Sequence, residues 1–258
     1  MISAWLNLPS WQLILVLAAA FGAFGLMLYA LLFRVLPRDL VLRHGGLVAP
    51  FFTAFSVLFA LLTGFTANDT WERNRNAARA VLAEQDGLLD VYYLSLAAVT
   101  EMSAIRDTAR TYIDLVVQEE WPRLGDHARS DDAEAALGRL LTLVAEPRVA
   151  SESGVALQGA LVQSVLKLRS ARYDRLAISS SRSDELKWVS VLLLGMLTQL
   201  SLALTHLDKG RAQLAATLLY ACAVVAALGP VASREYPFHG DEGVTAAPLL
   251  AARAIMVR

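Results

Sequence analysis

The sequence is almost free of cysteine, and this excludes a fold built on disulfides. Cys222 is the only cysteine in 258 residues, so no disulfide can form within the chain. It lies in a long apolar run, where we expect it to act as a small buried hydrophobic side chain. The four histidines are scattered, with no pair four residues apart and no cysteine partner. The sequence therefore predicts no zinc site.

Motifs of catalysis and of nucleic-acid binding are also missing. The chain has no Gly-x-Ser-x-Gly and no glycine-rich phosphate loop. Its net charge of -1 gives no basic surface for a nucleic acid. Glu119 and Glu120, with Asp114 nearby, are interpreted as surface acids, because adjacent helix positions do not face one another. We predict that the protein is not an enzyme and uses no metal or cofactor.

Charge is scarce, and apolar residues gather in long runs. Only 18% of the residues are charged and 56% are hydrophobic, which is too apolar for an ordinary soluble domain. A helix rises about 1.5 Å per residue, so about 20 apolar residues cross a bilayer core. Four runs meet this length, and they cover residues 11–33, 47–67, 188–207 and 211–232. The sequence predicts an all-α membrane protein with four transmembrane helices.

The first run has a competing interpretation as a cleaved signal peptide. A signal peptide needs a basic start and a short apolar core. No lysine or arginine precedes this run, and Arg34 follows it directly. These features favour a transmembrane helix.

The segment between the second and third runs is polar but keeps helical periodicity, so we expect a helical extramembrane domain. Two further helices are predicted, one closed by Pro122 and one capped by the Ser130 region, before a long helix that begins near Val155. Each has an apolar stripe with spacings of three and four. The stripe residues are Met102, Ile105, Ala109, Tyr112, Ile113 and Val116; Leu137, Leu140, Leu141 and Val144; and Leu161, Val165, Leu168, Arg172 and Leu176.

Domain boundaries follow from these runs. We assign residues 1–68 to the first two spans, 69–187 to the helical domain, 188–232 to the last two spans and 233–258 to a tail. No proline interrupts residues 61–79, and Ser179, Ser180 and Ser181 continue toward the third span, so the domain is expected to be continuous with both helices. We expect Pro230 to end the fourth helix and residues 248–255 to form a short one. Basic residues occur in the two short loops and at both flanks of the helical domain, so the positive-inside rule allows either orientation. We slightly favour a cytoplasmic domain.

The exit of the second span resembles that of bacterial bestrophins. The matching residues are Gly64, Phe65, Asn68, Trp71 and Arg73, followed by Ala77 or Ala78. The chain is more similar still to the bestrophin-like family of bacterial four-span proteins, a domain of unknown function. The motifs of this family are Trp-Glu-Arg at residues 71–73, Glu-Trp-Pro at 120–122 and Pro-Phe-His-Gly at 237–240. The resemblance covers nearly the whole chain.

This resemblance implies a homo-oligomer in the bacterial inner membrane, with a pentamer as the expected assembly. The second helix would line a channel for small anions. Carried over residue by residue, the pore constriction is Val57, Leu61 and Phe65, and the pore mouth is Asn68, Asp69 and Arg73. Residues at i, i+4 and i+8 share a helix face, and copies of that face would form a hydrophobic constriction that gates by dewetting.

Other interpretations of the same residues stay open. Val57, Leu61 and Phe65 could pack on neighbouring helices or on lipid, and Asn68 and Asp69 could simply mark the end of the span. Arg73, Arg75 and Arg79 could draw anions to the pore mouth or form a solvated face paired with Glu72 and Glu84. The chain would then be a non-conducting, membrane-anchored helical module that binds a partner or senses a membrane condition.

Overall fold

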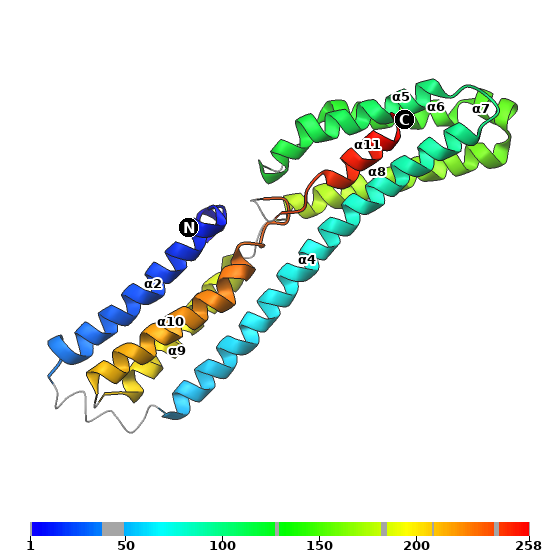
Figure 1. Ribbon diagram of the computed structural model, residues 1–258. Coiled ribbons are helices and arrows are strands. Elements are labelled where there is room, and N and C mark those ends of the chain that lie inside the picture. The colour runs from blue at the N-terminus through cyan, green and yellow to red at the C-terminus, as the bar shows by residue number, and fades with distance from the viewer. Residues whose placement is uncertain are drawn as a thin grey trace. The chain divides into compact units, whose positions relative to one another are not determined.

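The computed structural model describes residues 2–37, 49–126, 129–181, 185–207, 209–239 and 243–257, and helices dominate throughout them (Figure 1). No strand occurs in these ranges, so the all-α prediction is confirmed. In chain order the elements are α1 (Ile2–Leu6), α2 (Ser10–Ala30), the π-helical turn η1 (Leu31–Val35), α4 (Ala49–Ala97), α5 (Ser103–Leu115), the π-helical turn η2 (Val116–Glu120), the 3-10 turn η3 (Trp121–Asp126), α6 (Asp131–Ala145), α7 (Pro147–Ser153), α8 (Val155–Ser180), α9 (Glu185–Thr205), α10 (Gly210–Ala232) and α11 (Ala247–Ile255).

Four helices among the described residues are long and apolar enough to cross a membrane. They are Ser10–Val35, Phe51–Ala97, Glu185–Thr205 and Gly210–Ala232. The four predicted spans are therefore confirmed, and residues 47 and 48 of the second run lie outside the described part. The second helix does not stop at the end of its apolar run, since α4 continues without interruption to Ala97.

The chain divides into two compact units, and α4 contributes to both. We call the described residues of 2–72 and 185–236 the bundle unit. Within it, α10 packs against α2 and α9 (Figure 1). The helices approach closely at small residues: a Cβ added to Gly195 would lie 3.0 Å from the Phe21 ring. Small residues at interfaces are how membrane helices gain packing contacts without a hydrophobic driving force.

The second compact unit contains the described residues of 73–181, with 237–239 and 243–257, and we call it the helical unit. One apolar core joins α5, α6 and α8 to the last part of α4 and to α11. The predicted stripes face this core, and every stripe residue is buried except Leu141, which is half-buried. Ser130 caps α6 as expected, because its hydroxyl accepts a hydrogen bond from the Ala133 N–H at 3.1 Å.

Three helix ends differ from the sequence prediction. The helix that begins at Val155 does not run on into the third span, because Ser181 has an extended backbone with φ -69° and ψ 117°. Ser179, Ser180 and Ser181 each donate a hydroxyl hydrogen bond to the carbonyl three residues before. Such local bonds compete with the helical ladder. Pro230 lies inside α10, which ends two residues later. The helix closed by Pro122 leaves α geometry earlier, at Val116.

Cys222 is exposed, so the prediction of a buried role is wrong. It lies on α10, a membrane-spanning helix whose outward side chains meet lipid or another chain rather than water. An apolar position on such a helix does not have to face the interior.

Gly87 allows α4 and α8 to come into backbone contact within the helical unit. A Cβ at this position would lie 3.0 Å from the Leu168 Cβ and 3.1 Å from its Cα and N atoms. We expect Gly87→Ala to destabilise the protein by about 1–3 kcal/mol, the usual cost of overpacking. Thermal unfolding of the full chain in detergent measures this.

Gly159→Ala is the matched control for this substitution. Gly159 lies within α8 with no atom near its added Cβ, so the same change should be neutral or stabilising by up to about 1 kcal/mol. Equal unfolding midpoints for the two variants would contradict the close approach at Gly87.

Candidate functional site

The membrane part of α4 presents an apolar stripe that no described residue of its own chain covers. Val57, Leu61 and Phe65 are 60%, 54% and 63% exposed. Four residues advance a helix by about 40° beyond one turn, so the three side chains occupy one side of α4. Phe59 and Leu62 lie on the other side and pack against the core of the bundle unit. The stripe is free to meet water, lipid or another chain.

The three predicted pore-mouth residues do not share one side of the helix. Asn68 is exposed and lies one turn beyond Phe65 on the stripe. Asp69 is also exposed, lies four residues beyond Phe65 and so about 40° further round the helix, and accepts a hydrogen bond from Lys187 Nζ at 2.8 Å. Arg73 is half-buried on the packed side. The structure therefore places Asn68 and Asp69 at the end of the stripe, on either side of Phe65, and separates Arg73 from it.

A polar cluster of the bundle unit holds the segment of α4 next to Asp69. Thr70 donates a hydroxyl hydrogen bond to Glu235 Oε2 at 2.8 Å, and Lys187 Nζ lies 3.4 Å from Glu235 Oε1. Thr70 and Glu235 are fully buried. This cluster links α4 and the start of α9 to the segment after α10, which fixes the rotation of α4 about its axis at this level.

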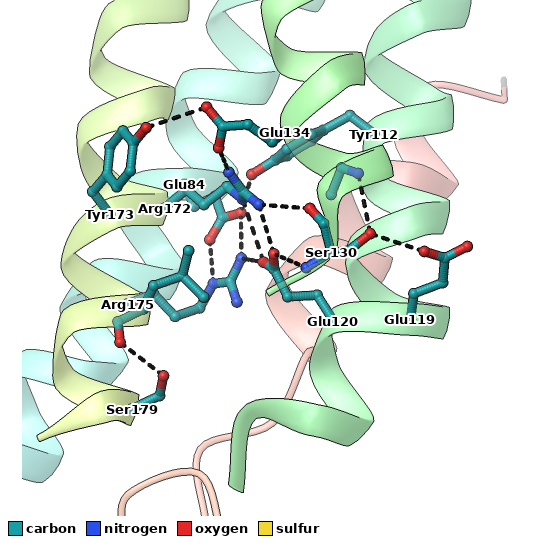
Figure 2. A network of polar contacts seen from close by, with 12 residues as sticks. Glu84, Tyr112, Glu119, Glu120, Ser130, Glu134, Arg172, Tyr173, Arg175 and Ser179 are labelled. Carbon is teal, nitrogen blue, oxygen red and sulfur yellow. Dashed lines mark hydrogen bonds and ion pairs between the residues drawn. The ribbon is translucent and has the colours of Figure 1, made fainter. Parts of the chain in front are cut away.

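The helical unit contains a buried ion-pair network that the sequence interpretation missed (Figure 2). Arg175 on α8 pairs with Glu84 of α4 at 2.6 Å and with Glu120 of η2 at 2.8 Å. Arg172, one turn earlier, binds the other oxygen of Glu120 at 2.7 Å and also pairs with Glu134. Tyr112 donates its hydroxyl to Glu84 Oε1 at 2.5 Å. Apart from Glu134, all of these side chains are buried.

Two predictions about these acids are wrong. Glu120 is buried between two arginines rather than lying on the surface as expected. Glu84 forms an ion pair with Arg175 and accepts a hydrogen bond from Tyr112, instead of pairing with the arginines of α4. The signal that could have found the network is the position of Glu84 between Val81 and Leu88 on the buried side of α4. Arg172 and Arg175 occupy the same kind of position on α8, and buried charges are almost always paired.

Trp121, the first residue of η3, lies at one end of the network. The Arg175 guanidinium lies 5.4 Å from the centroid of its ring, and the ring of Phe238 packs against it at 5.9 Å in a T-shaped arrangement. These contacts make Trp121 a packing anchor at the end of η2. Every carboxylate of the network is occupied by donors from its own chain, so its geometry suits holding helices together rather than binding a substrate. Among the described residues no cluster of His, Cys, Asp and Glu could hold a metal ion.

The electrostatics of the network favour a charged Glu120 and a neutral Tyr112. Burial by itself would raise the pKa of Glu120, but the hydrogen bond from Arg172 and the charges of Arg175 and Arg172 outweigh it and hold this pKa below its usual value. Burial and the neighbouring Glu84 charge raise the pKa of Tyr112 well above its ordinary value. Both shifts keep the ion pairs intact at neutral pH.

Acid should therefore weaken the helical unit. A carboxyl whose pKa is lower in the folded state binds fewer protons there than in the unfolded chain. Its contribution to stability is complete above the unfolded pKa of about 4.3 and is lost as the pH falls through the lower folded pKa. We expect the unfolding midpoint to fall between about pH 5 and pH 3, and a smaller fall in Glu120→Gln. Identical pH profiles for the two proteins would contradict this assignment to Glu120.

These observations define a class of protein: a four-span, all-helical membrane protein with a helical extramembrane domain between the second and third spans. The chain belongs to the bestrophin-like family, since the model of the Bestrophin-like domain matches residues 19–249. No curated protein sequence gives a significant match.

Solved structures of a bacterial bestrophin homologue from Klebsiella pneumoniae share the fold. One variant has a TM-score of 0.72 at 11% identity, covering 95% of this chain and 97% of that one. A second has a TM-score of 0.68 at 12% identity with the same coverage. A third has a TM-score of 0.64 at 15% identity, with 95% of both chains covered. The sequence resemblance to bestrophins is thus confirmed at the level of family and fold.

Proposed function

We propose that the protein forms a homo-oligomer, a pentamer, that conducts small anions along α4. The observation that carries this proposal is the uncovered apolar stripe of Val57, Leu61 and Phe65. Membership of the bestrophin-like family supports it. In an oligomer with α4 at its axis, the stripes of all chains would face one another and form a hydrophobic constriction.

The location of the channel is part of the same proposal. We place residues 1–68 and 188–232 in the bacterial inner membrane, and residues 69–187 outside the bilayer. Residues 233–258 follow the last span as a tail. The buried ion pairs of the helical unit would then serve as a rigid support for the extramembrane half of α4.

Two measurements on the unaltered protein test this function. Mass measurement of the detergent-solubilised complex should give several chains, because a pore on one helix of each chain needs them. Protein reconstituted into liposomes should pass chloride faster than empty liposomes. A monomer, or a folded preparation without chloride flux, would refute the channel and leave a non-conducting, membrane-anchored module as the function.

A further inference from the structure

The turn η1 and the start of α10 meet at one end of the bundle unit. A Cβ added to Gly210, the first residue of α10, would lie 3.2 Å from the ring of Phe33 in η1. The backbone of α10 therefore packs directly on this aromatic side chain. Arg34 follows Phe33 in the sequence, and Lys209 and Arg211 flank Gly210. The contact thus brings three basic residues from two distant segments to the same end of the unit.

These three basic side chains are exposed, and within the described ranges of the chain none of them is recorded in an ion pair. The connecting segments 34–46 and 206–211 together contain five basic residues and two acids, Asp39 and Asp208, which leaves three positive charges with histidine neutral. Both acids and the other two basic residues lie outside the described part of the structure. This end of the bundle unit is therefore basic.

The start of α10 adds to this positive charge. The first N–H groups of a helix have no partner within the helix, and together they give its N-terminus a partial positive charge. The first turn of α10 contains no acidic residue, and Lys209 at the N-cap makes no capping hydrogen bond through its side chain. Lysine and arginine are unfavourable at this end of a helix, so an anion bound there would offset the repulsion.

A buried amide one turn into α10 has no protein partner. Gln213 is fully buried, and neither its Nε2 nor its Oε1 atom forms a hydrogen bond with any described residue. Gln213 lies three residues after Gly210, so both face the same side of α10. Side chains on a helix lean toward its N-terminus, which directs Gln213 toward the basic residues. Because buried polar groups are nearly always hydrogen-bonded, this amide indicates that a polar group from outside the chain binds at the start of α10.

We infer that the start of α10 binds the phosphate of an anionic phospholipid headgroup. Its charged donors are Arg34, Lys209 and Arg211. Gln213 supplies a neutral donor one turn deeper in the bundle unit. Charged donors and the open N–H groups of a helix N-terminus are the groups that bind phosphate in proteins. The inference concerns a lipid at the edge of the bundle unit and does not depend on the proposed channel.

The position of the site favours a lipid over a free anion. The first span ends at Val35 and the fourth begins at Gly210, so the basic residues lie where the apolar part of the unit ends, at the level of the headgroups. Leu31 and Val35 on η1 are 39% and 70% exposed, and the acyl chains of the same lipid can cover them. Basic pockets between membrane helices are known to bind anionic headgroups.

The experiment adds phosphatidylglycerol to the full-length protein in a nonionic detergent and follows the unfolding midpoint. A ligand that binds only the folded protein raises this midpoint as its concentration increases, which gives an apparent affinity for each variant. Phosphatidylglycerol should raise the midpoint more than phosphatidylcholine, which has the same phosphate but no net charge. Arg34→Gln and Arg211→Gln should each weaken the affinity about fivefold, the usual contribution of one basic side chain near anionic lipid.

Gln213→Leu tests the same site without a change of charge. It should weaken the affinity roughly threefold through the loss of one neutral hydrogen bond, and removal of an unpaired buried amide is not expected to unfold the protein. Arg139→Gln is the charge-matched control, because Arg139 is an exposed arginine on α6 in the helical unit. Its affinity for phosphatidylglycerol should equal that of the unaltered protein.

Three results would overturn the inference. The first is equal affinity for the two lipids, or unchanged affinity in both arginine variants. The second is unchanged affinity in Gln213→Leu, which would show attraction to surface charge alone. The third is an equal rise in the midpoint with inorganic phosphate, which would assign the site to a free anion. None of these measurements involves chloride flux, so their outcome is separate from that of the proposed channel.

Discussion

Replacement of Arg175 by methionine is expected to unfold the helical unit or to leave it close to unfolding. Arg175 donates to both Glu84 and Glu120, and all three side chains are fully buried. Methionine fills much of the arginine volume but supplies no donor. Two carboxylates would then lose charged partners in a core that water does not reach.

The expected loss is about 3–5 kcal/mol, the range for breaking a buried ion pair by removing one partner. Typical domains have a total stability of about 5–15 kcal/mol, so this is a large part of the whole. Arg172 stays in place and can neutralise one oxygen of Glu120, but it is not recorded as a partner of Glu84 in the described structure. The buried carboxylate of Glu84 is therefore destabilised more than that of Glu120.

Denaturant unfolding of the full chain in detergent, followed by circular dichroism, measures this loss. Arg169→Met is the matched control, because Arg169 lies on the exposed side of the same helix, and surface changes usually alter stability by less than about 0.5 kcal/mol. Equal stability of the two variants would show that the network does not hold the helical unit together. Recovery of stability in Arg175→Met with Glu84→Gln would identify the unpaired Glu84 charge as the cause.

Shortening of Leu61 to alanine is expected to increase chloride flux about tenfold. Leu61 is the central member of the apolar stripe, and its side chain would be the narrow, dry point of the proposed pore. A smaller side chain widens this point and makes it easier to wet. A fall of about 1.4 kcal/mol in the barrier corresponds to a tenfold change in rate. Chloride efflux from liposomes at equal protein content measures the change.

Leu219→Ala separates a pore effect from a general effect of losing an exposed leucine. Leu219 is 71% exposed on α10, so its truncation should leave flux as it was. A similar change in both variants, or none in Leu61→Ala while the unaltered protein conducts, would show that the stripe does not form the constriction.

The sequence predicts elements whose cause is local or periodic. Four apolar runs are sufficient to predict four spans, and the stripes on α5, α6 and α8 correctly identify the core of the helical unit. The Ser130 cap follows from local chemistry in the same way. These features depend on residues within a few positions of one another.

The buried network could not be read from single positions, because its cause is the meeting of distant segments. Glu84 and Arg175 are 91 residues apart, and Glu120 and Arg172 are 52 apart. Taken alone, each looks like a surface charge, and only the pairing makes its burial tolerable. The break at Ser181 is not predictable for another reason: serine is compatible with a helix, and its hydroxyl hydrogen bonds end the helix only by competition with the backbone bonds.

The π-helical turn η2 has a consequence for how this protein tolerates insertions and deletions. A π turn has one more residue than the α turn it replaces. Deletion of Gln118, an exposed residue inside η2, would remove this extra residue and restore α geometry, and the residues that follow would keep their orientation. A deletion within the regular α turns of α5 would instead rotate Glu120 by about 100°, away from Arg172 and Arg175, and Trp121 with it. The π turn is thus the place in this segment where the chain can lose a residue and keep the network.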